Sequence, residues 1–165
     1  MRSQPGGVPS AEIGRHRTRR HARGAAWVAS VDPTSANQQA AAADAPIVYV
    51  CVTCRPPGEP DSPVRQGEIL AAATSCAAAG TEVQVRRMRC LANCTRGASA
   101  AMRANGSWTY VFGGLDATSA DALIEGVRML ARAADGILPW RGRPAPLKRG
   151  LVARIPPIGF EEVDE

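Results

Sequence analysis

The chain has almost no histidine, and the two that it does have, His16 and His21, both lie near its start. The remaining residues therefore cannot form a histidine-based catalytic triad, a Rieske-type cluster or a mixed Cys/His zinc site. The sequence also has no apolar run close to the roughly 20 residues that a membrane-spanning helix needs. These absences argue against a membrane protein, and with no catalytic cluster in view they argue against an enzyme acting alone.

The charge is concentrated at the N-terminus. The net charge is +5 over 165 residues, and six arginines against three acidic residues give the first 45 residues +3 of it. The high isoelectric point therefore owes more to this segment than to the rest, so we expect no nucleic-acid partner. With 45% hydrophobic and 21% charged residues, the chain is long enough for one globular domain with tails.

Residues 1–45 read as a disordered basic leader, because Gly, Pro, Ser, Ala and Arg dominate and no apolar period is visible. Arg19-Arg20 faintly resembles a twin-arginine export signal, but the apolar stretch that follows is short and interrupted. We therefore expect a cytoplasmic protein. Residues 46–136 form the predicted domain, 137–157 an extended arm that packs on it, and 158–165 an acidic tail.

The domain alternates between strand and helix patterns. Asn105-Gly106 marks a tight hairpin turn, and the apolar spacing of two segments predicts amphipathic helices. Thr118 and Asp121 resemble a capping box at the start of the second helix. The expected elements are a strand at 47–50, a helix at about 62–79, strands at 82–88, 98–103 and 107–112, the last ending at Gly113-Gly114, and a helix at about 118–134.

This order, β-α-β-β-β-α, predicts an α/β (α+β) fold of the thioredoxin-like type. The β-α-β unit implies a parallel strand pair, and the hairpin adds an antiparallel pair, so the sheet is mixed and carries two helices. The arm at 137–157 is rich in Arg, Pro and Gly and is expected to run extended over the domain.

Four of the five cysteines form two close pairs, each just after a predicted strand: Cys51 with Cys54, and Cys90 with Cys94. Such a pattern points to metal or redox chemistry rather than to a disulfide framework. The fifth, Cys76, falls on the predicted apolar face of the first helix with Ile69, Leu70, Ala73 and Ala77. We expect it to be a buried hydrophobic residue and not a ligand.

Three chemistries compete for the four thiols. A [2Fe–2S] cluster takes four cysteine thiolates, and the small residues between Cys90 and Gly97 would let backbone N–H groups approach the sulfurs. A structural or carrier zinc site also accepts four cysteines, although this domain has a core of its own. A dithiol redox pair at Cys51 and Cys54 is disfavoured because Pro56-Pro57-Gly58 separates it from the helix that would lower its pKa.

Several motifs resemble an uncharacterised bacterial family described as predicted metal-binding (domain of unknown function 1636), and the strand order resembles the thioredoxin-like [2Fe–2S] ferredoxins. The resemblance spans residues 46–157. It rests on Val-Cys-Val-Thr-Cys-Arg (50–55), Cys-Leu-Ala-Asn-Cys-Thr-Arg-Gly (90–97), Gly-Ser-Trp-Thr-Tyr-Val-Phe-Gly-Gly-Leu (106–115), Leu-Pro-Trp (138–140), Arg-Pro (143–144) and Ala-Arg-Ile-Pro-Pro (153–157).

The resemblance implies a metal-binding protein whose genes tend to accompany cobalamin-related ones. Combined with the ligand pattern, it favours a [2Fe–2S] electron carrier with Cys51, Cys54, Cys90 and Cys94 as ligands. The partner would be a redox protein, and a homodimer stays open. Four arginines near the second pair would present a basic rim to an acidic partner, or are simply exposed strand residues: Arg86, Arg87, Arg89 and Arg96.

Overall fold

The computed structural model describes residues 44–55 and 62–161. The predicted disordered leader lies outside these residues up to position 43, as do positions 162–165 of the acidic tail. The predictions for those segments therefore stay predictions. Within the described part of the chain, no helix is long and apolar enough to cross a membrane.

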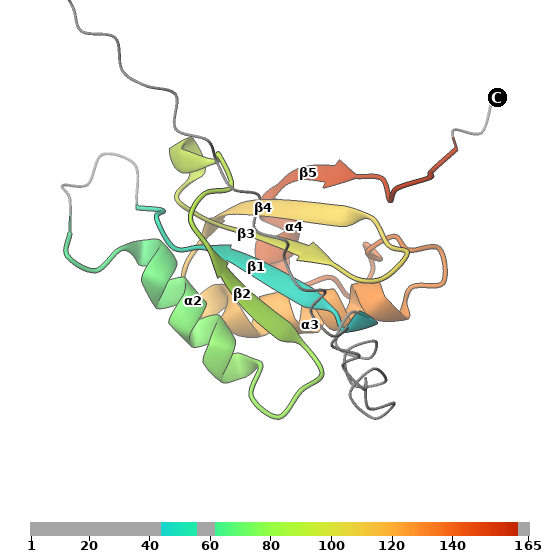
Figure 1. Cartoon of the computed structure of the whole chain (residues 1–165), viewed down its shortest axis with the longest axis horizontal. Coiled ribbons are helices and arrows are strands. Elements are labelled where there is room, and N and C mark those ends of the chain that lie inside the picture. Colours follow the sequence, from blue (N-terminus) through green and yellow to red (C-terminus); the bar gives the residue numbers. More distant parts are fainter. Residues whose placement is uncertain (1–43, 56–61, 162–165) are drawn as a thin grey trace, which may run out of the picture. The chain divides into compact units, whose positions relative to one another are not determined.

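A five-stranded mixed sheet forms the centre of the domain (Figure 1). The strand order is β2-β1-β3-β4-β5, in which β1 and β2 run parallel and the other neighbours antiparallel. A parallel pair needs a long crossover, whereas the two-residue turn at Asn105 and Gly106 suffices for an antiparallel one. The strands are β1 (Ile47–Cys51), β2 (Gln84–Met88), β3 (Ala98–Arg103), β4 (Thr109–Leu115) and β5 (Leu151–Ile155).

Two helices, α2 (Gln66–Ala77) and α3 (Ala120–Arg132), pack against each other and against β1 and β3. Both lie on the same face of the sheet (Figure 1). Helix α2 is the crossover between the parallel strands, and α3 follows the β3–β4 hairpin. The predicted β-α-β-β-β-α order, the mixed sheet and the α+β class are therefore confirmed. The short helices η1 (Cys94–Arg96), η2 (Ala117–Ser119) and α4 (Ala145–Arg149) complete the described elements.

The buried face of α2 differs from the predicted one. The structure buries Gly67, Leu70, Ala71 and Thr74, whereas Ile69 and Cys76 are exposed. The prediction of Cys76 as a buried residue was therefore wrong. The helix is so rich in alanine that its apolar period distinguishes the faces poorly. Thr74 can lie in the core because its hydroxyl donates to the Leu70 carbonyl oxygen at 2.7 Å.

The capping box near α3 is formed by a different pair from the predicted one and belongs to the preceding short helix η2. Asp116 and Ser119 form the capping box at η2, immediately before α3, in place of Thr118 and Asp121. The spacing of Leu123, Val127, Leu130 and Ala134 predicted the apolar stripe of this helix. The first three are buried, whereas Ala134 is exposed beyond the end of α3.

The segment 137–157 packs on the domain, but it is not simply an extended arm. It contains α4, and it ends in β5, which pairs with β4. Strand β4 does not end at Gly113-Gly114 but continues to Leu115. The Gly113 N–H donates to the Gly150 carbonyl at 2.9 Å, and a side chain on Gly150 would lie 2.6 Å from the Gly113 carbonyl oxygen. The glycines thus permit a close backbone approach that a propensity pattern does not reveal.

The buried side chain of Leu147 packs α4 against the core. It is fully buried, and a Cβ on Gly126 of α3 would come within 2.3 Å of its Cδ1, so the missing side chain at Gly126 makes room for it. We expect Leu147→Ala to lower the free energy of unfolding by about 2–5 kcal/mol, because it leaves a cavity between α3 and α4. Denaturant unfolding followed by circular dichroism measures the change.

The matched control is Ile158→Ala, since Ile158 is fully exposed beyond β5. It should change stability by less than about 0.5 kcal/mol. Equal effects of the two substitutions would show that α4 is not part of the domain core.

Candidate metal centre

The two cysteine pairs follow neighbouring parallel strands. Cys51 is the last residue of β1 and Cys54 lies in the turn after it, whereas Cys90 comes two residues after β2 and Cys94 opens η1. Because β1 and β2 run parallel, both loops leave the same end of the sheet (Figure 1). The four thiols therefore lie on loops at one end of the sheet.

Hydrogen bonds join the loop after β1 to the loop after β2. The Val52 N–H donates to the Met88 carbonyl oxygen at 2.9 Å, and the Thr53 hydroxyl donates to the Arg89 carbonyl oxygen. The Cys51 thiol lies 3.5 Å from the same Arg89 oxygen. Cys51 is thus in direct contact with the segment that leads into Cys90.

A second set of contacts joins Cys54 to the middle of the Cys90–Cys94 loop. Cys54 hydrogen-bonds to Ser99 at the start of β3, and the Asn93 side-chain amide donates to the Ser99 hydroxyl at 2.9 Å. Asn93 sits close over Gly113, where a Cβ would lie 2.3 Å from its amide nitrogen. Asn93 therefore holds the Cys90–Cys94 loop against the sheet, next to the Cys51–Cys54 turn.

The four thiols differ sharply in exposure. Cys51 and Cys54 are 1% and 2% exposed, whereas Cys90 and Cys94 face solvent, and all are free thiols. Within residues 44–55 and 62–161, no three His, Cys, Asp or Glu side chains gather around a point where one metal ion could bind. The structure brings the two loops together but does not close the four thiols into a cage, so the ligand set stays a prediction.

The Cys90 loop directs backbone N–H groups toward sulfur, as the small residues there suggested. The Ala92 N–H donates to the Cys90 sulfur at 3.2 Å, and Ala92 has a positive φ of 56°. That backbone conformation is unusual outside glycine and places the N–H on the sulfur side of the loop. Such N–H···S contacts stabilise negative charge on a thiolate, whether free or bound to a metal.

The pKa values of the two buried cysteines, Cys51 and Cys54, are shifted in opposite directions. Burial raises the pKa of Cys51, but hydrogen bonds from the Thr53 and Cys54 side chains and from the backbone at Leu91 and Thr53 outweigh it, so the net pKa is lowered. Burial, together with the hydrogen bond and charge of Cys51, raises the pKa of Cys54 to about 12, which contacts to Ser99 only partly offset. Negative charge in this pair therefore sits on Cys51.

The start of α2 also reaches the cysteines, contrary to the argument from the intervening prolines. The Gly67 N–H donates to the Cys54 carbonyl oxygen at 3.0 Å, and Arg65 donates to the Thr53 carbonyl oxygen at 3.1 Å. A Cβ on Gly67 would lie 2.1 Å from the Cys51 carbonyl oxygen. The first turn of α2 thus packs directly on the Cys51–Cys54 turn, which removes the main objection to dithiol chemistry there.

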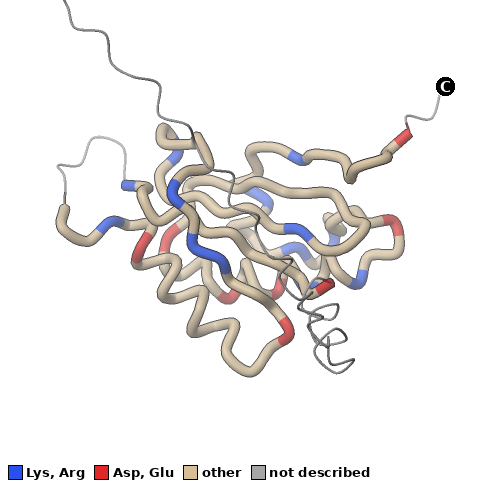
Figure 2. Tube along the Cα trace, in the orientation of Figure 1, with Lys and Arg blue, Asp and Glu red and all other residues tan. Residues whose placement is uncertain are grey.

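Basic residues border the second loop. Arg86, Arg87, Arg89 and Arg96 are all exposed, and Figure 2 shows this basic group along β2 and the loop that follows it. Arg87 forms an ion pair with Glu68 of α2, which fixes it to the domain surface. Exposure agrees both with a basic rim for a partner and with simple exposed strand residues, so the rim stays a prediction.

Sequence reasoning missed two residues that shape the site. Gly67 allows the helix to approach Cys51, and Ser99 connects Cys54 to Asn93. Each left a weak signal: a glycine in the first turn of a predicted helix, and a hydroxyl in an otherwise apolar strand. Neither signal identifies its partner, because the contacts join residues far apart in sequence.

The donor set fits a thiolate-bound metal centre. It offers four sulfurs, two on each loop, with backbone N–H groups nearby, and among the described residues no histidine or carboxylate is in the immediate contacts. Binding through all four would bring Cys90 and Cys94 inward from their exposed positions. Thiolates in this number suit zinc or an iron–sulfur cluster better than a hard cation such as Mg²⁺.

We expect Gly67→Ala to destabilise the protein, although alanine is intrinsically the better helix former by about 1 kcal/mol. The new methyl group meets a backbone carbonyl that cannot move without disturbing the Cys51–Cys54 turn, at a cost of about 1–3 kcal/mol. Thermal and denaturant unfolding measure the effect. Gln66→Ala, one residue earlier, is the control and should be nearly neutral. A Gly67→Ala protein as stable as the unmodified chain would contradict the close packing.

Comparison with known proteins gives one family and one solved structure. A search of curated proteins finds no match. A solved thioredoxin-like [2Fe–2S] ferredoxin from Aquifex aeolicus is 18% identical, with a TM-score of 0.44, over 72% of this chain and 99% of that one. The family described as "Protein of unknown function (DUF1636)" matches residues 48–157, from the second residue of β1 to two residues beyond β5. The chain therefore belongs to the DUF1636 family.

Proposed function

We propose that this protein holds a [2Fe–2S] cluster on Cys51, Cys54, Cys90 and Cys94 and serves as an electron carrier. The observation that carries the proposal is the junction of the two cysteine loops, in which Cys51 lies 3.5 Å from the Arg89 carbonyl oxygen. Two pairs of thiols on two adjoining loops match the two thiolates that each iron of such a cluster requires. When bound, the cluster supplies one-electron transfer.

The surrounding residues suit a negatively charged thiolate group near the surface. The Ala92 N–H already points at the Cys90 sulfur, and the Leu91 backbone hydrogen-bonds to Cys51. Hydrogen bonds of this kind raise the reduction potential of a cluster, because they stabilise its more negative, reduced form. The basic rim would act in the same direction and would attract an acidic redox partner.

Zinc is the competing metal, because four thiolates also satisfy its tetrahedral preference. A dithiol redox function is the second candidate, and a specific contact favours it: α2 begins directly on the Cys51–Cys54 turn, through Gly67. In that case Cys90 and Cys94 would have no chemical role. A cluster or a zinc site therefore requires Cys90 and Cys94 as ligands, whereas dithiol exchange does not.

The decisive measurement is anaerobic purification followed by an absorption spectrum and by iron, sulfide and zinc analysis. We expect a coloured protein that contains iron and acid-labile sulfide in equal amounts. Cys90→Ser and Cys94→Ser should each lose most of the cluster, because serine is a poor replacement for a thiolate. Cys76→Ser is the matched control: it is an exposed cysteine on α2, and its replacement should leave the metal content unchanged.

Other results point to a different function. A colourless protein that contains one zinc ion would indicate a zinc-binding module instead of an electron carrier. A metal-free protein with a Cys51–Cys54 disulfide, unaffected by Cys90→Ser, would establish dithiol exchange. Loss of metal in Cys76→Ser would show that the ligand set is wrong.

The proposal includes a cytoplasmic location, since free thiols persist where the cell keeps cysteines reduced. The link with cobalamin-related genes rests on the family resemblance alone and stays a prediction.

A further inference from the structure

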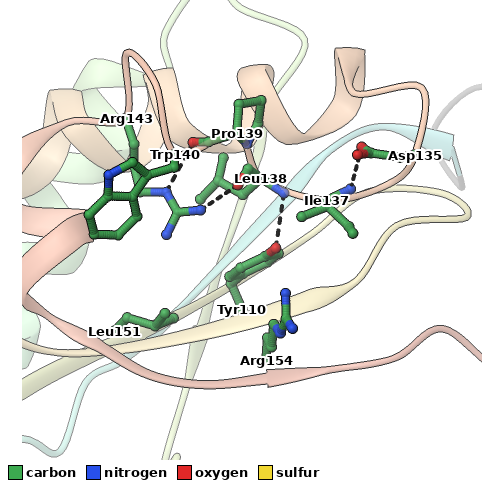
Figure 3. Close-up of a pocket in the computed structure, with 9 residues that line it drawn as sticks. All are labelled: Tyr110, Asp135, Ile137, Leu138, Pro139, Trp140, Arg143, Leu151 and Arg154. Atoms are coloured by element: carbon green, nitrogen blue, oxygen red, sulfur yellow. Dashed lines mark hydrogen bonds between the residues drawn. The ribbon is translucent and has the colours of Figure 1, made fainter. Parts of the chain in front are cut away.

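A pocket of about 500 Å³ lies between β4, β5 and the loop that follows α3 (Figure 3). Its walls contain no cysteine. They include Tyr110, Leu138, Trp140, Arg143, Leu151 and Arg154. The motifs without cysteine that carry the family resemblance meet here: Leu-Pro-Trp at 138–140, Arg143 of the Arg-Pro pair, Arg154, and Tyr110. The proposed metal centre uses none of these residues.

Arg143 is a buried cation without a carboxylate partner. It is 7% exposed, and its guanidinium group donates through Nε to the Pro139 carbonyl oxygen at 3.1 Å and through Nη2 to the Leu138 carbonyl oxygen. Among the described residues it forms no ion pair, and its Nη1 has no hydrogen-bond partner. Figure 3 shows that this third nitrogen points away from the two carbonyls. Among the described residues no fully buried side-chain nitrogen lacks a partner, so Nη1 is accessible from the pocket. The guanidinium group also lies over the Tyr110 and Trp140 rings, at 5.7 and 5.2 Å from their centroids. An anion in the pocket could therefore reach Nη1 directly.

A second positive charge lies on the same pocket as Arg143. Arg154 reaches up from β5 beside Tyr110, on the same pocket (Figure 3). Burial lowers the pKa of Arg143, Tyr110 opposes that shift, and the charge of Arg154 lowers the pKa further. The pocket's one carboxylate, on Asp135, accepts the Ile137 N–H at 3.0 Å at the far side of the loop. Two positive charges thus share a pocket in which they repel each other.

The aromatic side chains add a flat surface and a polar group. Trp140 is 64% exposed, and both Arg143 and Lys148 lie over its ring, at 5.2 and 5.4 Å from the centroid. The Tyr110 hydroxyl accepts the Leu138 N–H at 3.0 Å, and its own proton has no acceptor within the described part of the chain. An exposed tryptophan and a free hydroxyl donor beside two arginines are suited to a ligand that is both flat and anionic.

We propose that this pocket binds a small molecule with a carboxylate or phosphate group attached to a planar ring. The oxyanion lies between Arg143 Nη1 and Arg154, where it also accepts the Tyr110 hydroxyl proton, and the ring lies against Trp140. Two nitrogens of Arg143 hold the 138–143 loop in place through the Pro139 and Leu138 carbonyl oxygens. This arrangement leaves the third nitrogen, Nη1, open to the pocket. Arg154 also lies over the Trp108 ring, at 4.8 Å from its centroid, and lines the same pocket.

Isothermal titration calorimetry tests the proposal with three probes: benzoate, phenyl phosphate and inorganic phosphate. At least one of the ring-bearing probes should bind saturably in the low-millimolar range or better, and more tightly than inorganic phosphate. The comparison of benzoate with phenyl phosphate shows which oxyanion the pocket prefers. Amide NMR should place the largest shift change at Leu138, whose N–H reports on the Tyr110 hydroxyl.

Arg154→Gln should weaken binding roughly tenfold, because it removes one charge-assisted contact. Trp140→Ala should abolish the preference for a ring. Arg141→Gln is the matched control, since Arg141 is exposed in the same loop but does not line the pocket, and it should bind as the unmodified chain does. Arg154 and Trp140 are both exposed, so neither change removes core packing. Absence of saturable binding by both ring-bearing probes, or binding that Arg154→Gln leaves unchanged, overturns the proposal.

Discussion

The parallel pairing of β1 with β2 is the constraint on which the cysteine site depends. Their shared register, from Ile47 opposite Gln84 to Cys51 opposite Met88, makes both strands end together. The two loops can then exchange hydrogen bonds from Thr53 to Arg89 and from Val52 to Met88. Residues almost forty positions apart become neighbours for this reason alone. An antiparallel pairing would have placed the two cysteine pairs at opposite ends of the sheet.

The two cysteine pairs differ in solvent exposure, and this difference affects how firmly each pair is held in place. Cys51 and Cys54 lie in the core cluster and are held by α2, so their positions follow from the folding of the domain. Cys90 and Cys94 lie on a loop that is held through Asn93 but not buried. One half of the site is thus preorganised by packing, while the other half would gain its burial from a bound metal. Metal binding of this kind adds its free energy to the stability of the fold.

The C-terminal segment gives the domain a second polar feature. Leu138 and Leu147 are buried in the core, and β5 extends the sheet beyond β4. Between them Arg143 is enclosed, with two of its nitrogens used to hold the loop. The family match runs to residue 157 and so includes this segment. The described part of the chain therefore carries two separate groups of polar residues, one of thiols at the ends of β1 and β2 and one of cations beside β4 and β5.

Much of the fold followed from local patterns. The strand Ala98–Arg103, the Asn105-Gly106 turn and all of the apolar stripe of α3 except Ala134 appear as predicted, because each depends on residues close in sequence. The prediction failed at Cys76, where an alanine-rich helix gives little contrast between its faces. It failed also at β5, where a strand is stabilised by its neighbour rather than by its own composition.

The sequence by itself determined which atoms are available: four thiols in two pairs, no histidine near them, and the strands that precede each pair. Only the tertiary structure decided which of these atoms meet. It placed α2 on Cys54 through Gly67, tied Cys54 to Asn93 through Ser99, and buried Arg143 between two strands and a loop. The physical reason is that burial and hydrogen bonding across a sheet depend on strand pairing, and strand pairing joins residues whose separation along the chain carries no local signal.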